Sequence, residues 1–337
     1  ASLANARRSA VVDLNKILKQ DEKYNLPIME SYNSAIIYEG HVRDLTIYKD
    51  SNVINKGKYL GLCEKGRTTN NNFPVGFDYI KNLNITHLQL LPIYDYETVD
   101  ELKPNDSYNW GYDPQQYFVP EGSYATNPDD PYSRIVELKK MINEYHKVGI
   151  RIVMDVVFNH IYEYQYSSLE KIVPNYYFRR KNNGTGKIVS TSGCGNDIAS
   201  EKKMVSKFIV DACKFWIDFY DIDGFRFDLM GIIDVDTINK ITNYSKSVKP
   251  DFILYGEGWN MGGDLKPETY ARMENYKLLP HVSFFNDYFR EVVKGATFPD
   301  KIKDLGYGLG NRNLNQIFKF VLVGSAFKLI HEPKFDN

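Results

Sequence analysis

Short apolar runs alternate along the chain with longer amphipathic segments. In residues 130–148 apolar side chains recur every three or four positions, which predicts a helix, and Gly149 ends it as glycine commonly does. The mostly apolar segment that follows, residues 150–158, shows the pattern of a buried strand. The same alternation predicts strands near residues 36, 88, 152, 224, 253 and 283, and further helices over residues 77–83, 202–220 and 235–248.

This alternation predicts an α/β fold with a parallel sheet, because apolar strands followed by helices are covered on both faces. Six strands suit an open doubly wound sheet, and they are also two short of a closed (β/α)8 barrel of the TIM type. Residues 161–199 interrupt the pattern, since they are rich in Tyr, Asn and Gly and have no clear period. A long insertion after a strand of such a sheet usually shapes the rim of an active site. The tail, residues 317–327, resembles a helix or loop more than a strand.

The charge composition excludes two classes of partner. Lys and Arg total 42 and Asp and Glu total 43 among 337 residues, which gives a net charge of −1. Such a balance lacks the basic face that nucleic acid or an anionic membrane requires, and no run of about eighteen apolar residues could span a bilayer. Aromatic residues are frequent, at 14% with 26 Tyr. Most should fill the core, but aromatic rings also pack against the C–H faces of sugars.

The three cysteines, Cys63, Cys194 and Cys213, cannot all pair within the chain and show no CxxC spacing. We therefore expect reduced, mostly inert thiols, with neither a disulfide framework nor a zinc site. Reduced thiols are compatible with the cytoplasm. The chain starts at Ala1 without a signal peptide, as a processed or cut chain would, so its localisation stays unknown.

Charged residues follow three successive predicted strands. Asp155 and His160 lie at the end of the strand near residue 152, Asp228 follows the strand near 224, and Glu257 follows the strand near 253. In a parallel barrel these strand ends meet at one mouth, so Asp228 and Glu257 would lie side by side. Glycosidic bond cleavage requires two such carboxylates, one ionised to attack the anomeric carbon and one protonated to serve the leaving oxygen.

Neighbouring residues suggest which carboxylate has which role. Arg226 lies two positions before Asp228, so both side chains point to the same face of the strand and the guanidinium would keep Asp228 ionised. Glu257 is flanked by two glycines and followed by Trp259, and less solvated surroundings would favour its protonated form. Each residue also has a plain structural interpretation. An Asp at a strand end is usually a cap, Arg226 and Asp228 could form a buried ion pair, and Trp259 could belong to the core. His160 alone would more often be a structural histidine.

Three of these segments resemble the first three conserved regions of the α-amylase superfamily, glycoside hydrolase family 13. They are residues 155–160 (DVVFNH), 223–228 (DGFRFD) and 255–257 (YGE). Residues 108–114 (YNWGYDP) resemble the signature of type I pullulanases, the α-1,6 debranching enzymes, and residues 37–44 (IYEGHVRD) resemble their first barrel strand. The resemblance covers nearly the whole chain, from about residue 11 onward, with all regions in order.

The resemblance implies a role for each matching residue. Asp228 would be the nucleophile that forms a covalent glycosyl-enzyme, Glu257 the general acid and then base, and Arg226 the residue that orients the nucleophile. The implied outcome is retention of anomeric configuration, with the two carboxyl groups about 5–5.5 Å apart. The other substrate-binding candidates are Tyr112 stacked beneath the sugar, His160 in contact with it, Asp155 in support, and Trp259.

The chain departs from the family pattern near its C-terminal end. We do not find the third acidic residue of the family, in a His-Asp motif after the seventh strand, nor strands seven and eight. Residues 336–337 (DN) echo that motif only superficially, because no apolar strand leads into them. We therefore expect a fragment with a linker at residues 1–33 and an incomplete catalytic barrel domain at residues 34–337, with little or no activity alone. Its partners would be an α-glucan and the missing C-terminal part of the same polypeptide.

Two alternatives use the same scaffold: a non-catalytic α-glucan-binding module, and an α-1,4-acting amylase or transferase. Residues 108–114 argue against the second. The glycine-rich residues 306–310 do not follow a strand of a βαβ unit, which argues against a nucleotide site. The chemistry requires no cofactor, although Asn159 and oxygen ligands in residues 161–199 could hold a structural calcium, as in some relatives.

Overall fold

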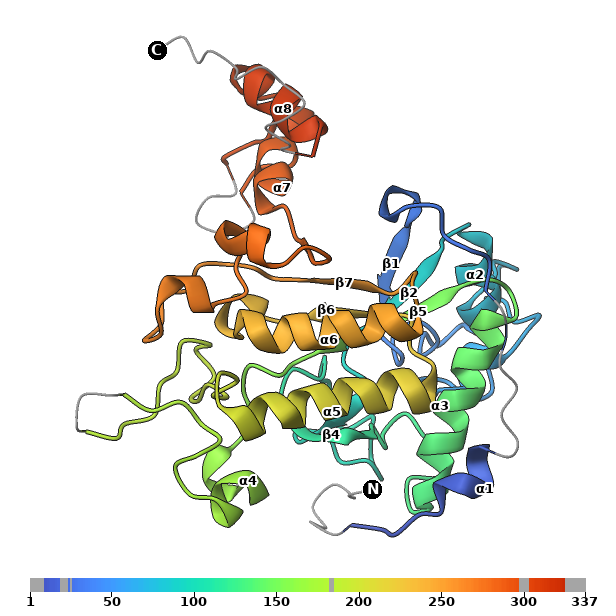
Figure 1. Ribbon diagram of the computed structural model, residues 1–337. Helices are drawn as coiled ribbons and strands as arrows, with labels where there is room; N and C mark the ends of the chain where they lie inside the picture. The colour runs from blue at the N-terminus through green and yellow to red at the C-terminus, as the bar shows by residue number, and fades with distance from the viewer. Residues whose placement is uncertain (1–8, 19–23, 25, 182–184, 297–302, 325–337) are drawn as a thin grey trace. The chain divides into compact units, whose positions relative to one another are not determined.

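The computed structural model describes residues 9–18, 24, 26–181, 185–296 and 303–324 (Figure 1). The chain divides into two compact units, Ala1–Ser283 and Phe284–Asn337, which are described separately. The first unit contains all of the predicted site residues.

Six strands form one sheet in the order β1-β2-β5-β6-β7-β8, which follows their order along the chain. The four successive pairs from β1 to β7 are all parallel. A doubly wound sheet would reverse its strand order at a switch point, so this order decides for the barrel-type sheet. The strands lie where the sequence predicted them: β1 (Ile37–Gly40), β2 (His87–Leu90), β5 (Arg151–Val156), β6 (Gly224–Phe227), β7 (Ile253–Gly256) and β8 (Ser283–Phe284).

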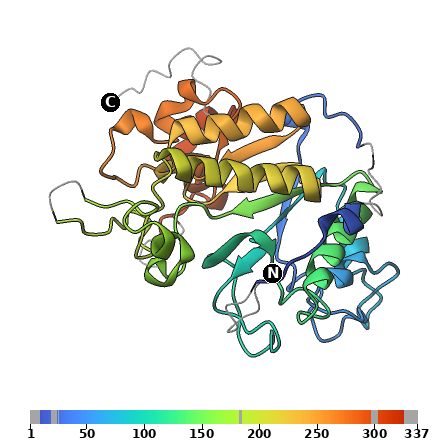
Figure 2. The same ribbon diagram turned by 60° about the horizontal axis from the view of Figure 1, so that its bottom comes forward.

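Helices connect the strands of the first unit and cover the sheet. The described helices are α1 (Leu14–Leu18), α2 (Gly76–Asn82), α3 (Pro131–His146), α4 (Ser168–Ile172), α5 (Lys203–Tyr220) and α6 (Val235–Val248). α5 and α6 run side by side along one face of the sheet (Figures 1 and 2). Trp216 of α5 is completely buried there, and Asp234 caps α6 by accepting a hydrogen bond from the backbone N–H of Thr237.

Several 3-10 turns complete the first unit. They are η1 (Tyr32–Ser34), η2 (Leu60–Cys63), η3 (Tyr164–Tyr166), η4 (Met230–Ile232), η5 (Pro267–Thr269) and η6 (Met273–Leu278). No helix among the described residues is long and apolar enough to cross a lipid bilayer. Cys63, Cys194 and Cys213 are free thiols, as predicted. Burial raises the pKa of Cys63 to about 12, which makes this thiol a poor nucleophile at neutral pH.

An antiparallel hairpin of β3 (Tyr94–Tyr96) and β4 (Pro114–Pro120) was not predicted from the sequence. β3 has only three residues, and β4 begins and ends with proline, so neither shows a readable strand period. The connection between the two strands contains most of the segment 108–114. Glu101 in this connection forms a buried bidentate pair with Arg134 of α3, with both nitrogen–oxygen distances at 2.7 Å. The pair anchors the hairpin to the body of the unit.

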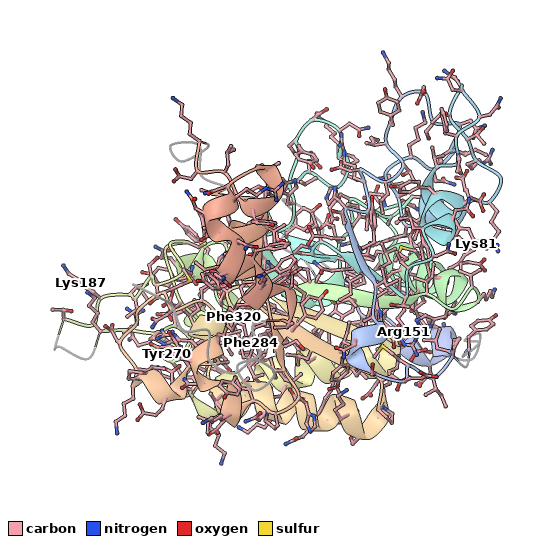
Figure 3. All side chains as sticks on the ribbon, turned by 90° about the horizontal axis from the view of Figure 1, so that it is seen from above. Lys81, Arg151, Lys187, Tyr270, Phe284 and Phe320 are labelled. Atoms are coloured by element: carbon pink, nitrogen blue, oxygen red, sulfur yellow. The ribbon has the colours of Figure 1, made fainter. Side chains whose placement is uncertain are left out.

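The irregular segment 161–199 after β5 contains η3, α4 and isolated bridges. Lys187 lies on a loop that extends outward from it (Figure 3). Near its end the segment returns to the end of β5. The backbone N–H of Ile198 donates to the carbonyl of Asn159 at 2.8 Å. The side chain of Asn196 bonds both backbone groups of Ile161, at 3.1 and 2.7 Å. The insertion is therefore fastened at both ends beside one strand end.

The second unit is small and helical. It contains α7 (Asp287–Val293), α8 (Asn315–Leu322), η8 (Tyr307–Leu309) and η9 (Arg312–Leu314). Val292, Phe320 and Val321 form its core. The helix α8 agrees with the prediction for residues 317–327 up to Leu322, and residues 325–327 lie outside the described residues.

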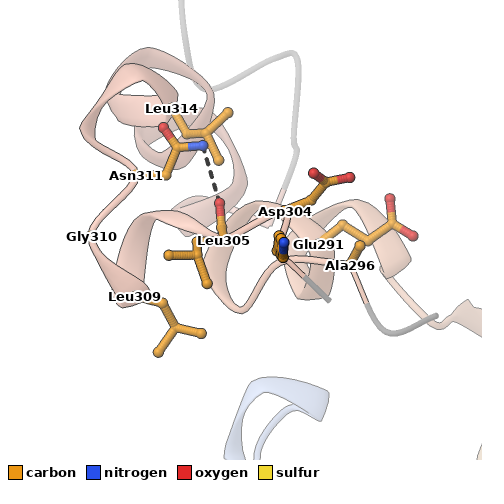
Figure 4. Close-up of a pocket in the computed structure, with 9 residues that line it drawn as sticks. Glu291, Ala296, Asp304, Leu305, Leu309, Gly310, Asn311 and Leu314 are labelled. Carbon is orange, nitrogen blue, oxygen red and sulfur yellow. Dashed lines mark hydrogen bonds between the residues drawn. The ribbon is translucent and has the colours of Figure 1, made fainter. Parts of the chain in front are cut away.

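The glycine-rich residues 306–310 lie in this second unit and contain η8 rather than a phosphate-binding loop. Leu309 and Gly310 line a hollow of about 720 Å³ (Figure 4). Glu291, Asp304 and Lys303 are the charged residues that line the same hollow, so two carboxylates face one ammonium group and the balance does not favour a phosphate. The structure therefore gives no support to a nucleotide site.

Candidate active site

Asp228 and Glu257 lie at the carboxyl ends of neighbouring strands. Asp228 follows β6 directly, and its backbone N–H donates to the carbonyl of Val156 at 2.9 Å. Glu257 follows β7, and its backbone N–H donates to the carbonyl of Phe227 at 3.1 Å. Because β6 and β7 pair in parallel, both carboxylates stand at one edge of the sheet. This is the placement that the sequence predicted.

One guanidinium connects these two carboxylates. Nη1 of Arg226 donates to Oδ1 of Asp228 at 2.9 Å, and Nη2 donates to Oε1 of Glu257 at 2.7 Å. Nη1 also donates to Oδ1 of Asp155 at 3.0 Å. The donors of a guanidinium have a fixed planar geometry. The gap between Asp228 and Glu257 is therefore no wider than one guanidinium with its two hydrogen bonds.

Glu257 has a second anchor in the turn that follows Asp228. Its Oε2 accepts from the backbone N–H of Leu229 at 3.0 Å, and its carbonyl accepts from Gly231 at 2.9 Å. Leu229 has a left-handed φ of 41°, which is unusual for a branched side chain. Both donors to the Glu257 carboxylate favour its ionised form, whereas the flanking residues had suggested the protonated form.

Asp155 connects Arg226 to Tyr112. Asp155 is completely buried on β5, and its Oδ2 accepts from the Tyr112 hydroxyl at 2.7 Å. The Arg226 guanidinium carbon lies 5.9 Å from the centre of the Tyr112 ring. Burial raises the pKa of Asp155 to about 7, although the charge of Arg226 opposes this rise. Burial also raises the pKa of Tyr112 far above its usual range, so its hydroxyl stays protonated and donates.

His160 is buried between two carbonyl-type acceptors. Its Nδ1 lies 2.5 Å from Oδ1 of Asn159, and its Nε2 lies 3.0 Å from the backbone oxygen of Tyr112. A neutral ring donates from only one nitrogen, whereas an imidazolium makes both hydrogen bonds. Burial lowers the pKa of His160, and the charge of Asp228 opposes this effect. The ring therefore joins the end of β5 to the segment that carries Tyr112.

Solvent reaches the two carboxylates more readily than the groups that support them. The side chain of Asp155 is 0% exposed and that of Arg226 is 9% exposed. The side chains of Asp228 and Glu257 are 13% and 21% exposed. Asp228 and Glu257 are therefore more accessible than Asp155 and Arg226, the two charged groups that support them.

Asn159 belongs to this network, although sequence reasoning considered it only as a calcium ligand. Its Nδ2 donates to Oδ2 of Asp228 at 2.8 Å and to the carbonyl oxygen of Asp228 at 2.9 Å. Its Oδ1 faces His160, so both ends of the amide are engaged within the site. The sequence feature that could have identified Asn159 is its position next to His160 at the end of a predicted strand.

The segment 108–114 contacts the residues that follow β1. The hydroxyl of Tyr108 donates to Asp44, and Nε1 of Trp110 donates to the Tyr108 oxygen at 2.9 Å. His41 lies 3.3 Å from the same Asp44 carboxylate. Residues 37–44 and 108–114, the two segments whose sequences resemble those of pullulanases, thus pack against each other.

Trp259 lies two residues after Glu257 and is partly buried. Its backbone packs so closely against Gly231 of η4 that a Cβ there would clash with it. The structure therefore brings together Asp228, Glu257, Arg226, Asp155, Tyr112 and His160, and places Trp259 beside them.

A second group of carboxylates, Asp95, Glu101 and Glu121, lies in and beside the β3–β4 hairpin with oxygens within 4.8 Å of one another. Arg134 bonds both oxygens of Glu101, and two backbone N–H groups donate to Glu121. Burial, followed by the charge of Glu101, raises the pKa of Glu121 to about 7. An arginine and a proton can thus offset much of this charge, so the group by itself does not indicate a metal.

Comparisons with known proteins agree with this geometry. Residues 71–191 match the family described as the alpha-amylase catalytic domain. The chain is 45% identical over 313 residues to the pullulanase of Bacillus subtilis (strain 168), which covers 92% of this chain and 43% of that protein. It is 32% identical over 345 residues to the chloroplastic pullulanase 1 of Arabidopsis thaliana, which covers 87% of this chain and 35% of that protein.

Solved structures give the same relationship. The pullulanase of Anoxybacillus sp. LM18-11, in complex with maltotriose, matches with a TM-score of 0.92 and 46% identity over 96% of this chain and 46% of that chain. The pullulanase of Paenibacillus barengoltzii, in complex with maltohexaose and alpha-cyclodextrin, matches with a TM-score of 0.84 and 43% identity over 90% of this chain and 47% of that chain. The chain thus spans less than half the length of each of these relatives.

Proposed function

We propose that this chain, which belongs to the type I pullulanases of the α-amylase superfamily (glycoside hydrolase family 13), carries the nucleophile and general acid of a retaining hydrolase that cleaves α-1,6 branch linkages in α-glucans. The main support is the guanidinium of Arg226, called the Arg226 fork below. Its two terminal nitrogens donate hydrogen bonds to Asp228 and Glu257. Because the chain spans less than half the length of its relatives, the activity and substrate of the whole protein are part of this proposal.

In the first step Asp228 attacks the anomeric carbon while Glu257 gives its proton to the glycosidic oxygen. The bond between that carbon and oxygen breaks, and the sugar becomes an ester on Asp228. In the second step Glu257 removes a proton from water, which attacks the same carbon and releases Asp228. Two inversions give overall retention, and they require the two carboxyl groups to be about 5–5.5 Å apart.

Glu257 needs a proton for the first step, whereas the N–H donors of Arg226 and Leu229 stabilise a carboxylate. Both of its oxygens accept hydrogen bonds from N–H groups, which favours the carboxylate. We propose that the sugar enters between the carboxylates and separates Glu257 from Arg226, so that Glu257 takes up its proton there. Arg226 then remains bound to Asp228 and holds the nucleophile in place.

The surrounding side chains bind the sugar in this proposal. Tyr112 stacks beneath it, in an orientation that its hydrogen bond to Asp155 fixes. His160 contacts the sugar, and Trp259 contributes an aromatic surface after β7. The insertion 161–199 forms the rim of a catalytic domain that covers residues 34–337 and follows a linker at residues 1–33.

The proposed reaction needs no organic cofactor, because two carboxylic acid side chains carry out both steps. A structural calcium ion would need oxygen ligands other than the Asn159 amide. Its oxygen lies 2.5 Å from His160 Nδ1, and its nitrogen donates to Asp228. Residues 161–199 offer further oxygen ligands, so any such site would lie there rather than at the end of β5.

Hydrolysis of pullulan by the intact protein tests this proposal. The wild-type protein should release maltotriose, and Asp228→Asn and Glu257→Gln should each reduce kcat by at least about a thousandfold. Asp211→Asn, which changes an exposed carboxylate on α5, provides the matched control and should hydrolyse like the wild type. Full activity of Asp228→Asn, or cleavage of α-1,4 linkages alone, would refute the proposal.

A further inference from the structure

The hydrogen bonds of Asn159 are not explained by the roles assigned so far. We propose that Asn159 is a positioning residue, which fixes the orientation of the Asp228 carboxylate and joins it, through His160, to the segment that carries Tyr112. This inference rests on the proposed function, because it concerns the same nucleophile. It needs no metal or additional ligand.

Asp228 is held at both carboxylate oxygens by different residues. Arg226 donates to Oδ1 at 2.9 Å, and Asn159 donates to Oδ2 at 2.8 Å. Arg226 also bonds Asp155 and Glu257, so its position depends on three carboxylates. Asn159 gives the nucleophile a second anchor that does not move with the fork. It comes from β5, the strand on the opposite side of β6 from Glu257.

The surrounding acceptors determine which way the Asn159 amide points. Its Nδ2 faces the carboxylate and the carbonyl of Asp228, and both of these groups can only accept. The reverse orientation would bring three oxygens together without a proton between them. Oδ1 must therefore face His160 and accept from its Nδ1, which lies 2.5 Å away.

These contacts form a ring of polar contacts around the site, in which a neutral His160 that donates to Asn159 only touches the Tyr112 oxygen with its Nε2. The ring passes from Arg226 to Asp228, Asn159, His160, Tyr112 and Asp155, and returns to Arg226. Asn159 is the member that connects the nucleophile to the half of the ring that contains Tyr112. A shift of the Tyr112 segment would thus reach the nucleophile by this route as well as through Arg226.

Asn159 is held firmly enough to act in this way. It is 1% exposed, so bulk water hardly competes for its hydrogen bonds. Its carbonyl accepts from Ile198 at 2.8 Å, which fixes the backbone from the side of the insertion. The amide itself is held at both ends, by Asp228 at its nitrogen and by His160 at its oxygen.

Two variants of the intact protein distinguish the effect of losing the Asn159 hydrogen-bond donor from the effect of losing the volume of its side chain. Asn159→Ala removes the hydrogen bond to a charged carboxylate, and kcat should fall about 10- to 150-fold with little change in KM. Asn159→Asp has nearly the same shape and can still accept from His160, but it places a carboxylate against Asp228. We expect its loss of activity to be at least as large.

The pH profile distinguishes positioning from general support of the fold. Because Asn159 favours the ionised nucleophile, both variants should shift the acid limb of kcat/KM to higher pH. Asn196→Ala is the matched control, since Asn196 is equally buried and its side-chain amide bonds the backbone of Ile161 rather than Asp228. Its acid limb should stay in place, even if thermal unfolding shows a lower Tm.

The inference and the proposed function fail in different ways. A wild-type protein that does not hydrolyse pullulan refutes the proposed function. If the wild type is active but Asn159→Asp retains its kcat and its acid limb, only the role of Asn159 is refuted. A fall in Tm with unchanged kinetics would show that Asn159 has a structural role alone.

Discussion

Replacement of Arg226 by lysine should separate the geometry of its side chain from its charge. Nη1 donates to Asp155 and Asp228, while Nη2 donates to Glu257. Lysine carries the same charge on a single nitrogen and cannot reproduce the planar fork. We therefore expect Arg226→Lys to fold and to bind the substrate, but to lose the alignment of at least one of the two reacting carboxylates.

The size of this effect follows from the hydrogen bonds that are lost. One hydrogen bond to a charged group is worth about 1.5–3 kcal/mol. At about 1.36 kcal/mol per tenfold change in rate, kcat/KM should fall about 10- to 150-fold. Arg226→Met also removes the cation from between three carboxylates, of which Asp155 is completely buried. Its activity should therefore be lower still, and its stability should fall as well.

Initial rates on pullulan, measured from released reducing ends, give kcat/KM for each variant, and thermal unfolding shows whether it is folded. Arg290→Lys is the matched control, because Arg290 is exposed on α7 and should tolerate the same substitution. A folded Arg226→Lys protein with kcat/KM within about threefold of the wild type would refute the reasoning. The Arg226 fork would then not position the carboxylates.

Three further predictions concern the support of the site. Glu101→Gln leaves the buried guanidinium of Arg134 without its bidentate partner, and urea unfolding should show a loss of about 3–5 kcal/mol; an unchanged midpoint would contradict this. Although burial opposes it, the charge of Asp223 raises the pKa of His146 to about 9. The protonated His146 therefore stabilises the folded state. This contribution is complete below about pH 6.5 and is lost as the pH rises through about 9, so the free energy of unfolding of the wild type should fall across that window. His146→Gln should show no such fall. Gly231→Ala places a methyl group against the backbone of Trp259, two residues after the general acid, so kcat should fall. If the variant instead has the same kcat and KM as the wild type, this turn tolerates the movement that the methyl group requires.

The elements that could be predicted from the sequence are those with long or unbroken patterns. The segment 150–158 is apolar except for Arg151 and Asp155, and β5 lies within it, buried along its whole length. The pattern of strands and helices alone could not decide between a doubly wound sheet and a barrel-type sheet, because strand order depends on pairing between distant segments. The incomplete barrel was expected from the family resemblance. The β3–β4 hairpin was missed because a three-residue strand has no measurable period.

In the candidate site, too, some features could be predicted from the sequence and others could not. Asp228, Glu257 and Arg226 could be found because each lies at a strand end, where position in the chain determines position in space. The role of Asn159 depends on the direction of an amide between two strands, and the sequence does not record that direction. The hydrogen bond from Leu229 to Glu257 is donated by the backbone N–H, which nearly every residue type has, so the sequence could not predict it.

The central claim is that Asp228 attacks the sugar and that Glu257 assists from the neighbouring strand. A 5-fluoro α-maltosyl fluoride should form an ester with the nucleophile of the intact protein that breaks down slowly enough for mass spectrometry of a peptic digest. We predict that the adduct lies on the peptide containing Asp228 and that it is absent from Asp228→Asn. An adduct on Glu257 or on another carboxylate, or hydrolysis with inversion and no adduct, would contradict the account.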